Sequence, residues 1–337
     1  MTLPTRKLGR TGLDVTVLGF GSAPLGDIYE VLDDATAIAT AEAAAEAGIT
    51  LFDTAPLYGQ GSAEHRVGTA LRRRPAGSFV LSTKVGRLLT PAPEGRTRTT
   101  RFVGGLSFNV VHDYSYDAAM RSHEASLQRL GLPKVDVLLI HDADAWSHGP
   151  EEGPKRYREA MSGAYRALEK LRSEKVIRGF GIGVNDPVYA ARYLREGDFD
   201  CLLLAGRYTL LEQPALREVL PLAAERNIGV MLGGVFNSGI LATGAGGDAR
   251  YNYTPAPPEI ADRARRIEAV CKRYDVPLPV AALHFALAGP GVASLVLGSV
   301  KPDEIRRNVA AMSAKVPAAL WSDLKLEGLL EAAAPIP

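Results

Sequence analysis

Four ionisable side chains stand at or just after short apolar runs of this chain, and together they could move a proton while a hydride is transferred. Asp53 and Tyr58 occur in ITLFDTAPLYG, Lys84 ends FVLSTK, and His141 ends VDVLLIH. The composition of these runs is typical of strands. A barrel of parallel strands gathers their carboxyl ends at one mouth. We therefore expect a carboxylate, a phenol, an ammonium and an imidazole around a single pocket.

The residue types suggest a division of roles. Tyr58 is the candidate acid and base, although a free phenol has a pKa of about 10. We expect the ammonium of Lys84 to lower the pKa of Tyr58, because a nearby positive charge favours the phenolate. Asp53 would keep a buried Lys84 charged, and His141 would orient the substrate oxygen. No side chain accepts a hydride, so a cofactor must. Each residue alone also has an ordinary structural reading, as a cap, a loop aromatic or a strand end.

The elements that must position these residues alternate between strand and helix. Apolar, β-rich runs are found at residues 16–19, 50–53, 79–84, 135–141, 179–184, 201–204, 229–232 and 294–297. Amphipathic stretches between them include residues 35–47, 116–130, 157–173, 214–226 and 259–274. Such alternation predicts a parallel sheet covered by helices. Eight repeats favour an α/β fold of the (β/α)₈ TIM-barrel type over an open doubly wound sheet, with residues 1–337 as a single domain.

Segments outside this alternation have predicted places as well. Residues 6–19, with Gly9 and Gly12, read as an N-terminal β-hairpin that caps the far end of the barrel. Residues 86–115, 142–155 and 233–258 are too long for plain connections. All three follow strands, so we expect them at the mouth, where loops carry function.

Composition excludes several function classes. Hydrophobic residues make up 46% and charged residues 23% of the chain, and the formal net charge is +1. This charge offers no field for nucleic acid or an anionic membrane. The N-terminus does not resemble a signal peptide, and no apolar run is long enough for a membrane span, so we expect a cytoplasmic protein. The cluster His141, Asp142, Asp144 and His148 matches no metal-binding motif, and we predict no metal site.

The motifs DTAPLYG, STK and LLIH resemble those of the aldo-keto reductase superfamily, and the resemblance spans nearly the whole chain. It implies a (β/α)₈ barrel whose catalytic tetrad falls on Asp53, Tyr58, Lys84 and His141. It also implies an extended nicotinamide dinucleotide across the mouth. A Rossmann reading of the glycines around Gly21 is weak, because Pro24 replaces the third glycine.

The resemblance also implies the cofactor contacts. Asn185 in GIGVN would bind the carboxamide, and Tyr208 in AGRYTLL would stack on the nicotinamide ring, while the usual glutamine three residues earlier is Ala205. The remaining cofactor-binding residues implied are Gly21, Asp53, Phe236, Asn237, Ser238, Gly239, Leu241, Gly298, Ser299, Glu304 and Asn308. The segment 236–241 would wrap the pyrophosphate, and Asn308 would contact the adenine.

The segment LGSVKPDEIRRN bears on the choice of cofactor. Where NADPH-preferring relatives often carry basic residues, this chain has Gly298 and Glu304. A carboxylate repels a 2′-phosphate but accepts hydrogen bonds from a ribose hydroxyl. We therefore predict NAD over NADP, with Lys301, Arg306 and Arg307 as the counter-evidence.

Within the superfamily, AGRYTLLEQ and LGGVFNSGIL resemble the aldose 1-dehydrogenase branch, which includes L-fucose, D-threo-aldose and L-galactose dehydrogenases and a pyridoxal 4-dehydrogenase. The leading hypothesis is oxidation of an aldose or pyridoxal hemiacetal to a lactone, with Tyr58, His141 and Trp146 against the substrate. One alternative is an NADPH-dependent aldehyde or ketone reductase. Another is a non-catalytic NADP-binding regulatory subunit, like the β subunits of potassium channels.

Overall fold

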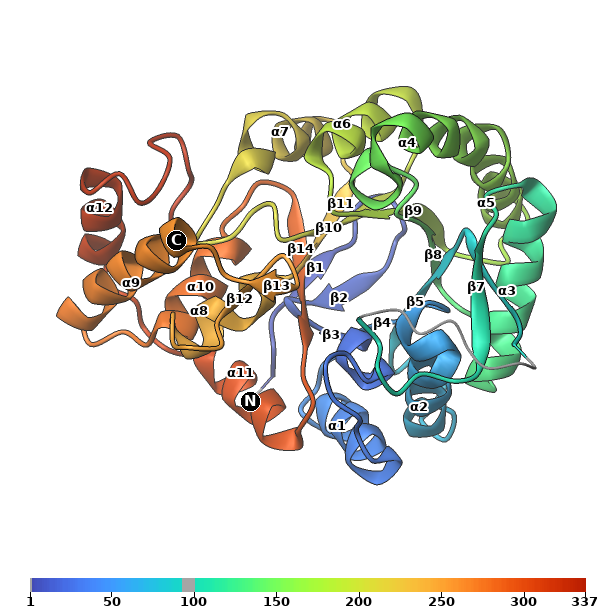
Figure 1. The fold of residues 1–337 in the computed structure, drawn as a ribbon, viewed down its shortest axis with the longest axis horizontal. Helices are drawn as coiled ribbons and strands as arrows, with labels where there is room; N and C mark the ends of the chain where they lie inside the picture. The colour runs from blue at the N-terminus through green and yellow to red at the C-terminus, as the bar shows by residue number, and fades with distance from the viewer. Residues whose placement is uncertain (1, 93–100) are drawn as a thin grey trace.

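The computed structural model describes residues 2–92 and 101–337, and its centre is a closed barrel of eight parallel strands (Figure 1). In ring order the strands are β3 (Leu18–Gly21), β4 (Leu51–Asp53), β5 (Val80–Val85), β8 (Val137–His141), β9 (Gly179–Val184), β10 (Cys201–Ala205), β11 (Gly229–Gly233) and β14 (Val292–Gly298), and β14 pairs back with β3. The predicted (β/α)₈ barrel is confirmed, with all eight strands within about two residues of the predicted bounds.

The predicted N-terminal hairpin is also present. Strands β1 (Thr5–Lys7) and β2 (Asp14–Thr16) pair antiparallel, so Thr16 belongs to the hairpin and β3 starts later than predicted. A β-carbon on Gly9 would lie 2.2 Å from the backbone oxygen of Asp200 and 2.3 Å from the amide nitrogen of Gly229. The turn, with a φ of 51° at Gly9, thus needs glycine to sit against the bottom of the barrel.

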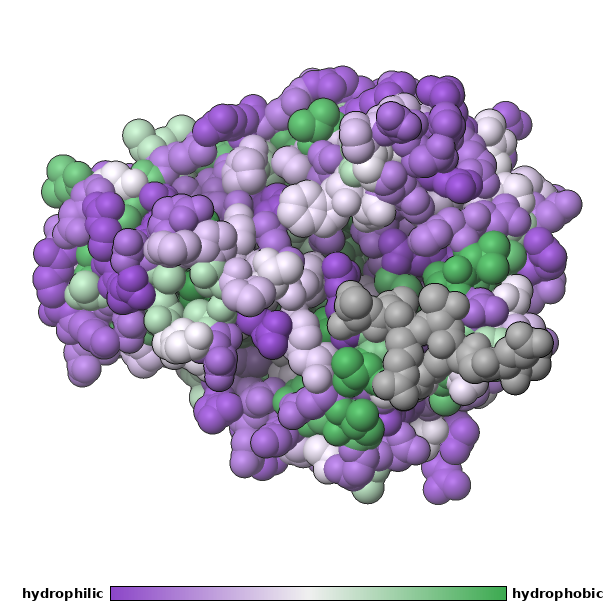
Figure 2. Space-filling view, viewed as in Figure 1, coloured by the Kyte–Doolittle hydropathy of each residue, from purple (hydrophilic) through white to green (hydrophobic). Residues whose placement is uncertain are grey.

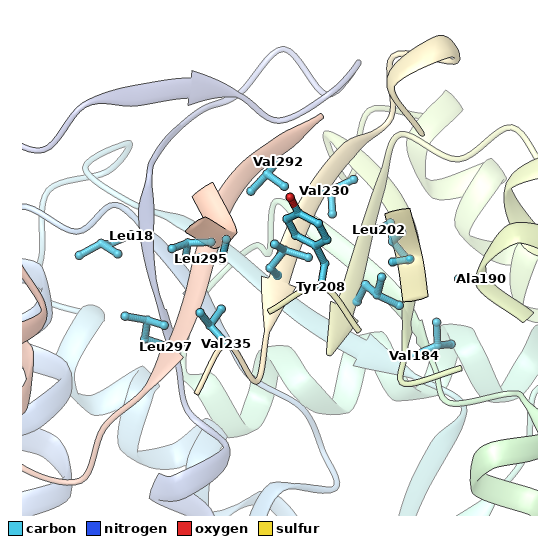
Figure 3. Close-up of a cluster of buried hydrophobic side chains, with 14 of the residues drawn as sticks. Leu18, Val184, Ala190, Leu202, Tyr208, Val230, Val235, Val292, Leu295 and Leu297 are labelled. Atoms are coloured by element: carbon cyan, nitrogen blue, oxygen red, sulfur yellow. The ribbon is translucent and has the colours of Figure 1, made fainter. Parts of the chain in front are cut away.

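The barrel strands are mainly apolar because both of their faces are buried, and their polar residues, such as Asp53 and Lys84, are concentrated in β4, β5 and the end of β8. Inside the barrel, residues such as Leu51, Val137 and Leu139 form a small core with Leu8 and Val15 of the hairpin segment. Outside, alternate residues pack against the helices in a larger core, part of which is drawn in Figure 3. The strand periodicity therefore determines which side chains face the mouth chamber and which face the helices.

The helices form the outer ring. They are α1 (Asp34–Glu46), α2 (Ser62–Leu71), α3 (Tyr116–Leu130), α4 (Ala145–Ser162), α5 (Ala164–Ser173), α6 (Pro187–Glu196), α7 (Val219–Glu225), α8 (Ile240–Thr243), α9 (Pro258–Arg273), α10 (Leu278–Leu287), α11 (Pro302–Ala311) and α12 (Ala318–Leu326). Figure 2 shows that the face over these helices is mainly hydrophilic. In the described part of the chain, no helix is long and apolar enough to cross a membrane.

Two predicted elements differ in the structure. The single helix predicted at 157–173 is broken at Gly163, where a β-carbon would lie 2.5 Å from the carbonyl oxygen of Tyr114. Much of the predicted loop 142–155 is helical, because the Asp144 side chain caps α4 by accepting from the Ser147 amide. The helix continues past a kink at Gly149, where φ is 79°.

The three long segments follow β5, β8 and β11, so all of them lie at the carboxyl mouth of the barrel. The first carries the antiparallel pair β6 (Arg87–Pro91) and β7 (Phe108–His112), while its residues 93–100 lie outside the described part. The second is the start of α4. The third carries α8 and the short pair β12 (Arg250–Tyr251) and β13 (Thr254–Pro255).

Candidate active site

Adjacent barrel strands bring the four predicted residues together. Asp53 ends β4, Lys84 lies one residue before the end of β5, and His141 ends β8, while Tyr58 follows β4 in the next loop. The Lys84 Nζ donates to Asp53 Oδ2 at 2.6 Å and lies 4.8 Å from the centre of the Tyr58 ring. The Tyr58 and His141 rings meet edge to face at 5.8 Å. The geometry therefore places a phenol, an ammonium and an imidazole around one point.

The backbone after Tyr58 explains how this ring is presented. Residues Tyr58–Gly61 form a short 3-10 turn in which Gly59, Gln60 and Gly61 have φ values of 60°, 50° and 101°. A β-carbon on Gly59 would lie 2.7 Å from Gly26 on the neighbouring loop. The glycines of YGQG thus allow a left-handed turn and a close approach of two backbones, which fix Tyr58 at the mouth.

The electrostatics correct one prediction. Burial raises the pKa of Tyr58 well above its ordinary value, and the Asp53 carboxylate raises it further. The net direction is the opposite of the predicted one, since burial and Asp53 dominate and the Lys84 ammonium is itself held by Asp53 and by the Thr54 carbonyl at 2.8 Å. Burial and the positive charges of Arg87 and Lys84 lower the pKa of His141 well below its usual value. At neutral pH, Tyr58 is therefore a neutral phenol and His141 a neutral imidazole.

Two adjoining cavities occupy the mouth. The inner chamber, about 60 Å³, is lined by Tyr58, Lys84 and His141. The outer chamber, about 450 Å³, is lined by Leu57, Arg87, Arg101, Phe102, Asn109, Val110, His112, Asp142, Trp146, Ser147 and Asn185. Leu57, Arg101, Phe102, Asp142 and Asn185 line both chambers. The candidate catalytic groups thus face a small space that adjoins a larger one with both polar and apolar walls.

Some residues of this site were not predicted. Arg87 Nη2 donates to Asp142 Oδ2 at 2.7 Å, and the same oxygen lies 3.4 Å from His141 Nε2. The Arg207 guanidinium stacks 4.5 Å from the ring centre of Trp146, the predicted substrate contact. Asp142 could have been nominated, because it directly follows the strand that ends in His141. Arg87 and Arg207 give no comparable signal in the sequence.

The turn between β12 and β13 adds an aromatic wall. Tyr253 lines the inner chamber, and the guanidinium of Arg101 lies 3.9 Å from its ring centre. The Tyr253 amide donates to Ser238 Oγ at 3.0 Å, while the Tyr251 hydroxyl donates to Glu212 at 2.9 Å. Of the two tyrosines, Tyr253 is therefore the one that flanks the chambers.

Several predicted cofactor residues also lie at the mouth. Gly21 ends β3 and pairs in register with Gly298, the end of β14, and Asn185 lines both chambers. The segment after β11 turns sharply, with φ values of 45°, 61° and 105° at Asn237, Ser238 and Gly239. Within this turn the amides of Asn237 and Gly239 donate to the carbonyls of Gly234 and Phe236, at 2.8 Å and 2.9 Å.

The rest of that segment faces inward. Leu241 is fully buried, and Phe236 packs against the same apolar core. The two side chains therefore stabilise the loop, and Leu241 can offer a ligand only its backbone.

The end of β14 and the start of α11 form the other side of the predicted dinucleotide site. Glu304 Oε2 accepts a hydrogen bond from the Val300 amide at 2.8 Å, and this bond fixes the carboxylate beside the strand end. Asn308 lies one turn further along α11 and is half-buried. A β-carbon on Gly298 would lie 2.7 Å from the Pro24 ring, which leaves little room for a larger residue.

Tyr208 is not where the resemblance placed it. Its side chain is 1% exposed and lies between strands and helices, among residues such as Val230 and Val292 (Figure 3). Its ring stacks on Phe285 of α10 at 5.2 Å between centres. In this position Tyr208 cannot stack on a nicotinamide in the mouth. The prediction is wrong because the chain after β10 turns the ring outward into the larger core.

Apart from Tyr208, the residues present fit a dinucleotide. The buried Ser299 Oγ and Asn237 Oδ1 have no hydrogen-bond partner within residues 2–92 and 101–337, so both keep an unused hydrogen-bonding capacity. A side chain would meet nothing within 4 Å at Gly239, so the turn at 237–239 borders open space. Within the same described ranges, no group of three His, Cys, Asp or Glu side chains is arranged to hold a metal ion.

Comparisons with known proteins agree with this geometry. The model of the aldo/keto reductase family matches residues 17–325. The chain is 44% identical to a pyridoxal 4-dehydrogenase of Microbacterium luteolum, over 96% of this chain and 97% of the relative. It is 41% identical to a D-threo-aldose 1-dehydrogenase of a Pseudomonas species, over 93% and 94%. Among solved structures, the holo form of a Bacillus halodurans aldo-keto reductase covers 98% of both chains, with a TM-score of 0.73 and 26% identity.

Proposed function

The chain belongs to the aldo/keto reductase family, and from this premise we propose that it oxidises the hemiacetal carbon of an aldose or of pyridoxal to a lactone with NAD. That it is a nicotinamide-dependent oxidoreductase follows from the family and from its dehydrogenase relatives. The observation that carries the finer proposal is the inner chamber, where Tyr58, Lys84 and His141 meet beside a larger cavity with polar and apolar walls. A cyclic hemiacetal offers one hydroxyl for a base and one hydrogen for hydride transfer.

We assign the proton transfer to Tyr58. In oxidation its phenolate oxygen would take the hemiacetal hydroxyl proton, and in reduction the neutral phenol would donate it back. The neutral imidazole of His141 would donate a hydrogen bond to the same substrate oxygen and fix its direction. Lys84, held by Asp53, would stabilise the phenolate while it exists. When bound, the nicotinamide ring supplies the hydride acceptor.

The dinucleotide would be held by the residues at the strand ends. Asn185, which lines both chambers, would bind the carboxamide, the turn 237–239 would border the pyrophosphate, and Ser299 would offer its buried hydroxyl. Asn308, together with Glu304 on α11, would border the adenosine. No role in this set falls to Tyr208.

We further propose that the cofactor is NAD rather than NADP. The Glu304 carboxylate is fixed by the Val300 amide, where a 2′-phosphate would meet repulsion and a ribose hydroxyl would find an acceptor. Of the basic residues nearby, Arg306 already pairs with Asp303. Michaelis constants for both cofactors test this proposal, and we expect the constant for NAD to be at least about tenfold lower, a difference of about 1.4 kcal/mol. A lower constant for NADP would contradict it.

Replacement of Tyr58 by Phe tests the reaction. Loss of the hydroxyl should lower turnover by about 10²–10⁴-fold, while dinucleotide binding, measured by equilibrium titration, should remain. The wild-type protein should be assayed on a panel of aldoses and pyridoxal with each cofactor, and the product should be identified as a lactone. Retained activity in Tyr58→Phe would remove this residue from its assigned role.

One observation favours a second candidate, an aldehyde or ketone reductase. The raised pKa of Tyr58 keeps the phenol protonated at neutral pH, which is the form that donates a proton in reduction. The chain is also 30% identical to an NADH-specific methylglyoxal reductase of Escherichia coli, over 91% of this chain and 90% of the relative. Faster turnover of simple aldehydes than of hemiacetals, each with its better cofactor, would select this candidate.

A further inference from the structure

A buried carboxylate stands where the two chambers meet. Asp142 directly follows His141 and lines both the inner and the outer chamber, although its exposed fraction is 9%. Arg87, with an exposed fraction of 7%, donates to its Oδ2 at 2.7 Å. Because the contacts from Arg87 and His141 both fall on Oδ2, the carboxylate retains acceptor capacity for a ligand.

The backbone aims this side chain. Asp142 has a φ of 49°, in the left-handed region, and its amide donates to the Gly183 carbonyl at 2.9 Å. Few residues other than glycine adopt this conformation, and aspartate and asparagine are the ones that tolerate it best. Such conformations concentrate at functional sites, where the surrounding structure holds them.

The walls of the outer chamber carry two guanidinium donors and one charged acceptor. Among the described residues that line it, Asp142 is the only carboxylate and Arg87 and Arg101 only donate, whereas Asn109, Ser147 and Asn185 are neutral groups that both donate and accept. A ligand hydroxyl that needs to donate a hydrogen bond close to the candidate catalytic groups therefore meets one charged acceptor. The neighbouring His141 ring would hold the reacting oxygen of the ligand. The Asp142 carboxylate would then lie near a hydroxyl on the carbon next to the reacting one.

We propose that Asp142, held in place by Arg87, is a specificity-determining residue that selects substrates with a hydroxyl group adjacent to the reacting centre. The substrate class is then the 2-hydroxy aldehydes, their cyclic hemiacetals, and aromatic aldehydes with an ortho hydroxyl. The inference rests on the proposed function, in that Tyr58 and His141 hold the reacting oxygen. A simple aldehyde has no hydroxyl to donate to the free oxygen of the Asp142 carboxylate. A buried polar group that loses its ligand hydrogen bond discriminates strongly between substrates.

Matched substrates that differ by one hydroxyl test this inference. The pairs are an aldose with its 2-deoxy analogue, and 3-hydroxypyridine-4-carboxaldehyde with pyridine-4-carboxaldehyde. In the wild-type protein, kcat/KM should favour the hydroxylated member of each pair by at least about tenfold, as expected for a hydrogen bond to a charged group. Asp142→Asn should reduce this ratio, because a neutral acceptor is weaker. Asp142→Gly, which also tolerates a positive φ, should bring it close to one.

The ratio of kcat/KM values within a substrate pair shows whether Asp142 binds the substrate hydroxyl or only positions His141. If Asp142 only positioned His141, its replacement would slow both members of a pair equally and leave the ratio unchanged, and that result would overturn the proposal. Asp144→Asn is the matched control, because Asp144 lies two residues away and lines neither chamber. Burial raises the pKa of Asp144 to about 7, so the amide resembles its protonated form. An equal drop of the ratio in this control would also overturn the proposal.

Binding provides a readout that does not depend on turnover. Trp146 lines the outer chamber, whereas the second tryptophan, Trp321, is fully buried elsewhere in the core. Tryptophan fluorescence should thus report the aldose pair binding, with the hydroxylated member tighter in the wild type and the difference lost in Asp142→Gly. The same ratios can be measured during reduction of the aldehydes. If no lactone forms with NAD but the preference for the hydroxyl persists, the proposed function fails and this inference stands.

Discussion

Strand β5 contacts a buried ion pair on each of its faces, through Lys84 on the inner face and the Thr83 hydroxyl on the outer face, and the two pairs hold different parts of the molecule. On the inner face, Lys84 pairs with Asp53 at 2.6 Å, and Ser82 donates to the other oxygen of that carboxylate. On the outer face, Thr83 donates to Glu64 at 2.8 Å, and Arg129 pairs with Glu64 at 2.5 Å.

The alternation of the strand separates the two environments. The inner pair borders a chamber that the candidate catalytic groups share, while the outer pair joins α2 and α3 to the barrel. Glu64 is fully buried, and Arg129 is largely covered. Both pairs have lost much of their hydration, so their presence is weak evidence for a gain in stability. The difference suggests that the inner charge is needed for chemistry and the outer one for a fixed helix position.

The largest expected effect comes from the inner pair. Lys84→Met should lower kcat/KM by about 10²–10⁴-fold, because Tyr58 would lose the cation that stabilises its phenolate. It should also destabilise the fold by leaving Asp53 unpaired. The double variant Asp53→Asn with Lys84→Met should recover the free energy of unfolding but not the activity. Recovered activity in the double variant would contradict the proposal that the inner ion pair is needed for chemistry.

The outer pair should behave in the opposite way. Glu64→Leu should lower the free energy of unfolding by about 3–5 kcal/mol, because it leaves Arg129 buried without its partner. The kcat of the folded protein should stay within about twofold of the wild type, since Glu64 lines neither chamber. Chemical denaturation measures the first value and steady-state kinetics the second.

A matched double variant, Glu64→Leu with Arg129→Met, should restore most of the stability lost, because apolar residues of similar volume replace buried pairs well. A large loss of kcat in any of these outer variants would mean that the helix layer controls the chemistry.

The pH dependence of the two reaction directions sharpens the account of the inner face. A raised pKa keeps Tyr58 protonated through the neutral range. Reduction, which needs the phenol, should therefore hold its rate at neutral pH and decline at alkaline pH. Oxidation, which needs the phenolate, should rise with pH, by up to about tenfold per unit while one proton must be lost. The measurement is kcat in both directions between about pH 6 and pH 11, and profiles that fall together at high pH would exclude Tyr58 as the shared acid and base.

The residues on the inner face of β5 could be predicted from the sequence, whereas those against its outer face could not. That Asp53, Tyr58, Lys84 and His141 meet was predictable, because strand periodicity and strand ends can be recognised in the local order of residues, as in FVLSTK followed by VDVLLIH. Glu64 and Arg129 were not, because α2 and α3 meet only through tertiary packing, and a buried charge on a helix looks like a solvated one in sequence. The predicted position of Tyr208 was wrong for a related reason. It stands three residues beyond β10, where strand alternation no longer determines which way a ring points.

The smallest expected effect tests whether an outer helix influences the cofactor site. The place to test it is the junction of β9 and α6, where a residue of the mouth and a helix cap are neighbours in the chain. Asp186 caps α6 by accepting from the Val188 amide at 2.9 Å and the Tyr189 amide at 3.2 Å, and it directly follows Asn185 of the mouth. Asp186→Ala should lower the free energy of unfolding by about 1 kcal/mol. The Michaelis constant for NAD should stay within about twofold, because the Asn185 carbonyl is held separately by Arg207 at 2.7 Å.

Asp186→Asn supplies the control for this last comparison, since asparagine caps helices about as well as aspartate. It should match the wild type in both measurements. If Asp186→Ala raised the Michaelis constant for NAD well beyond twofold while Asp186→Asn did not, the cap of α6 would itself position Asn185. The outer helices would then share in holding the cofactor, and the separation seen at β5 would not extend to β9.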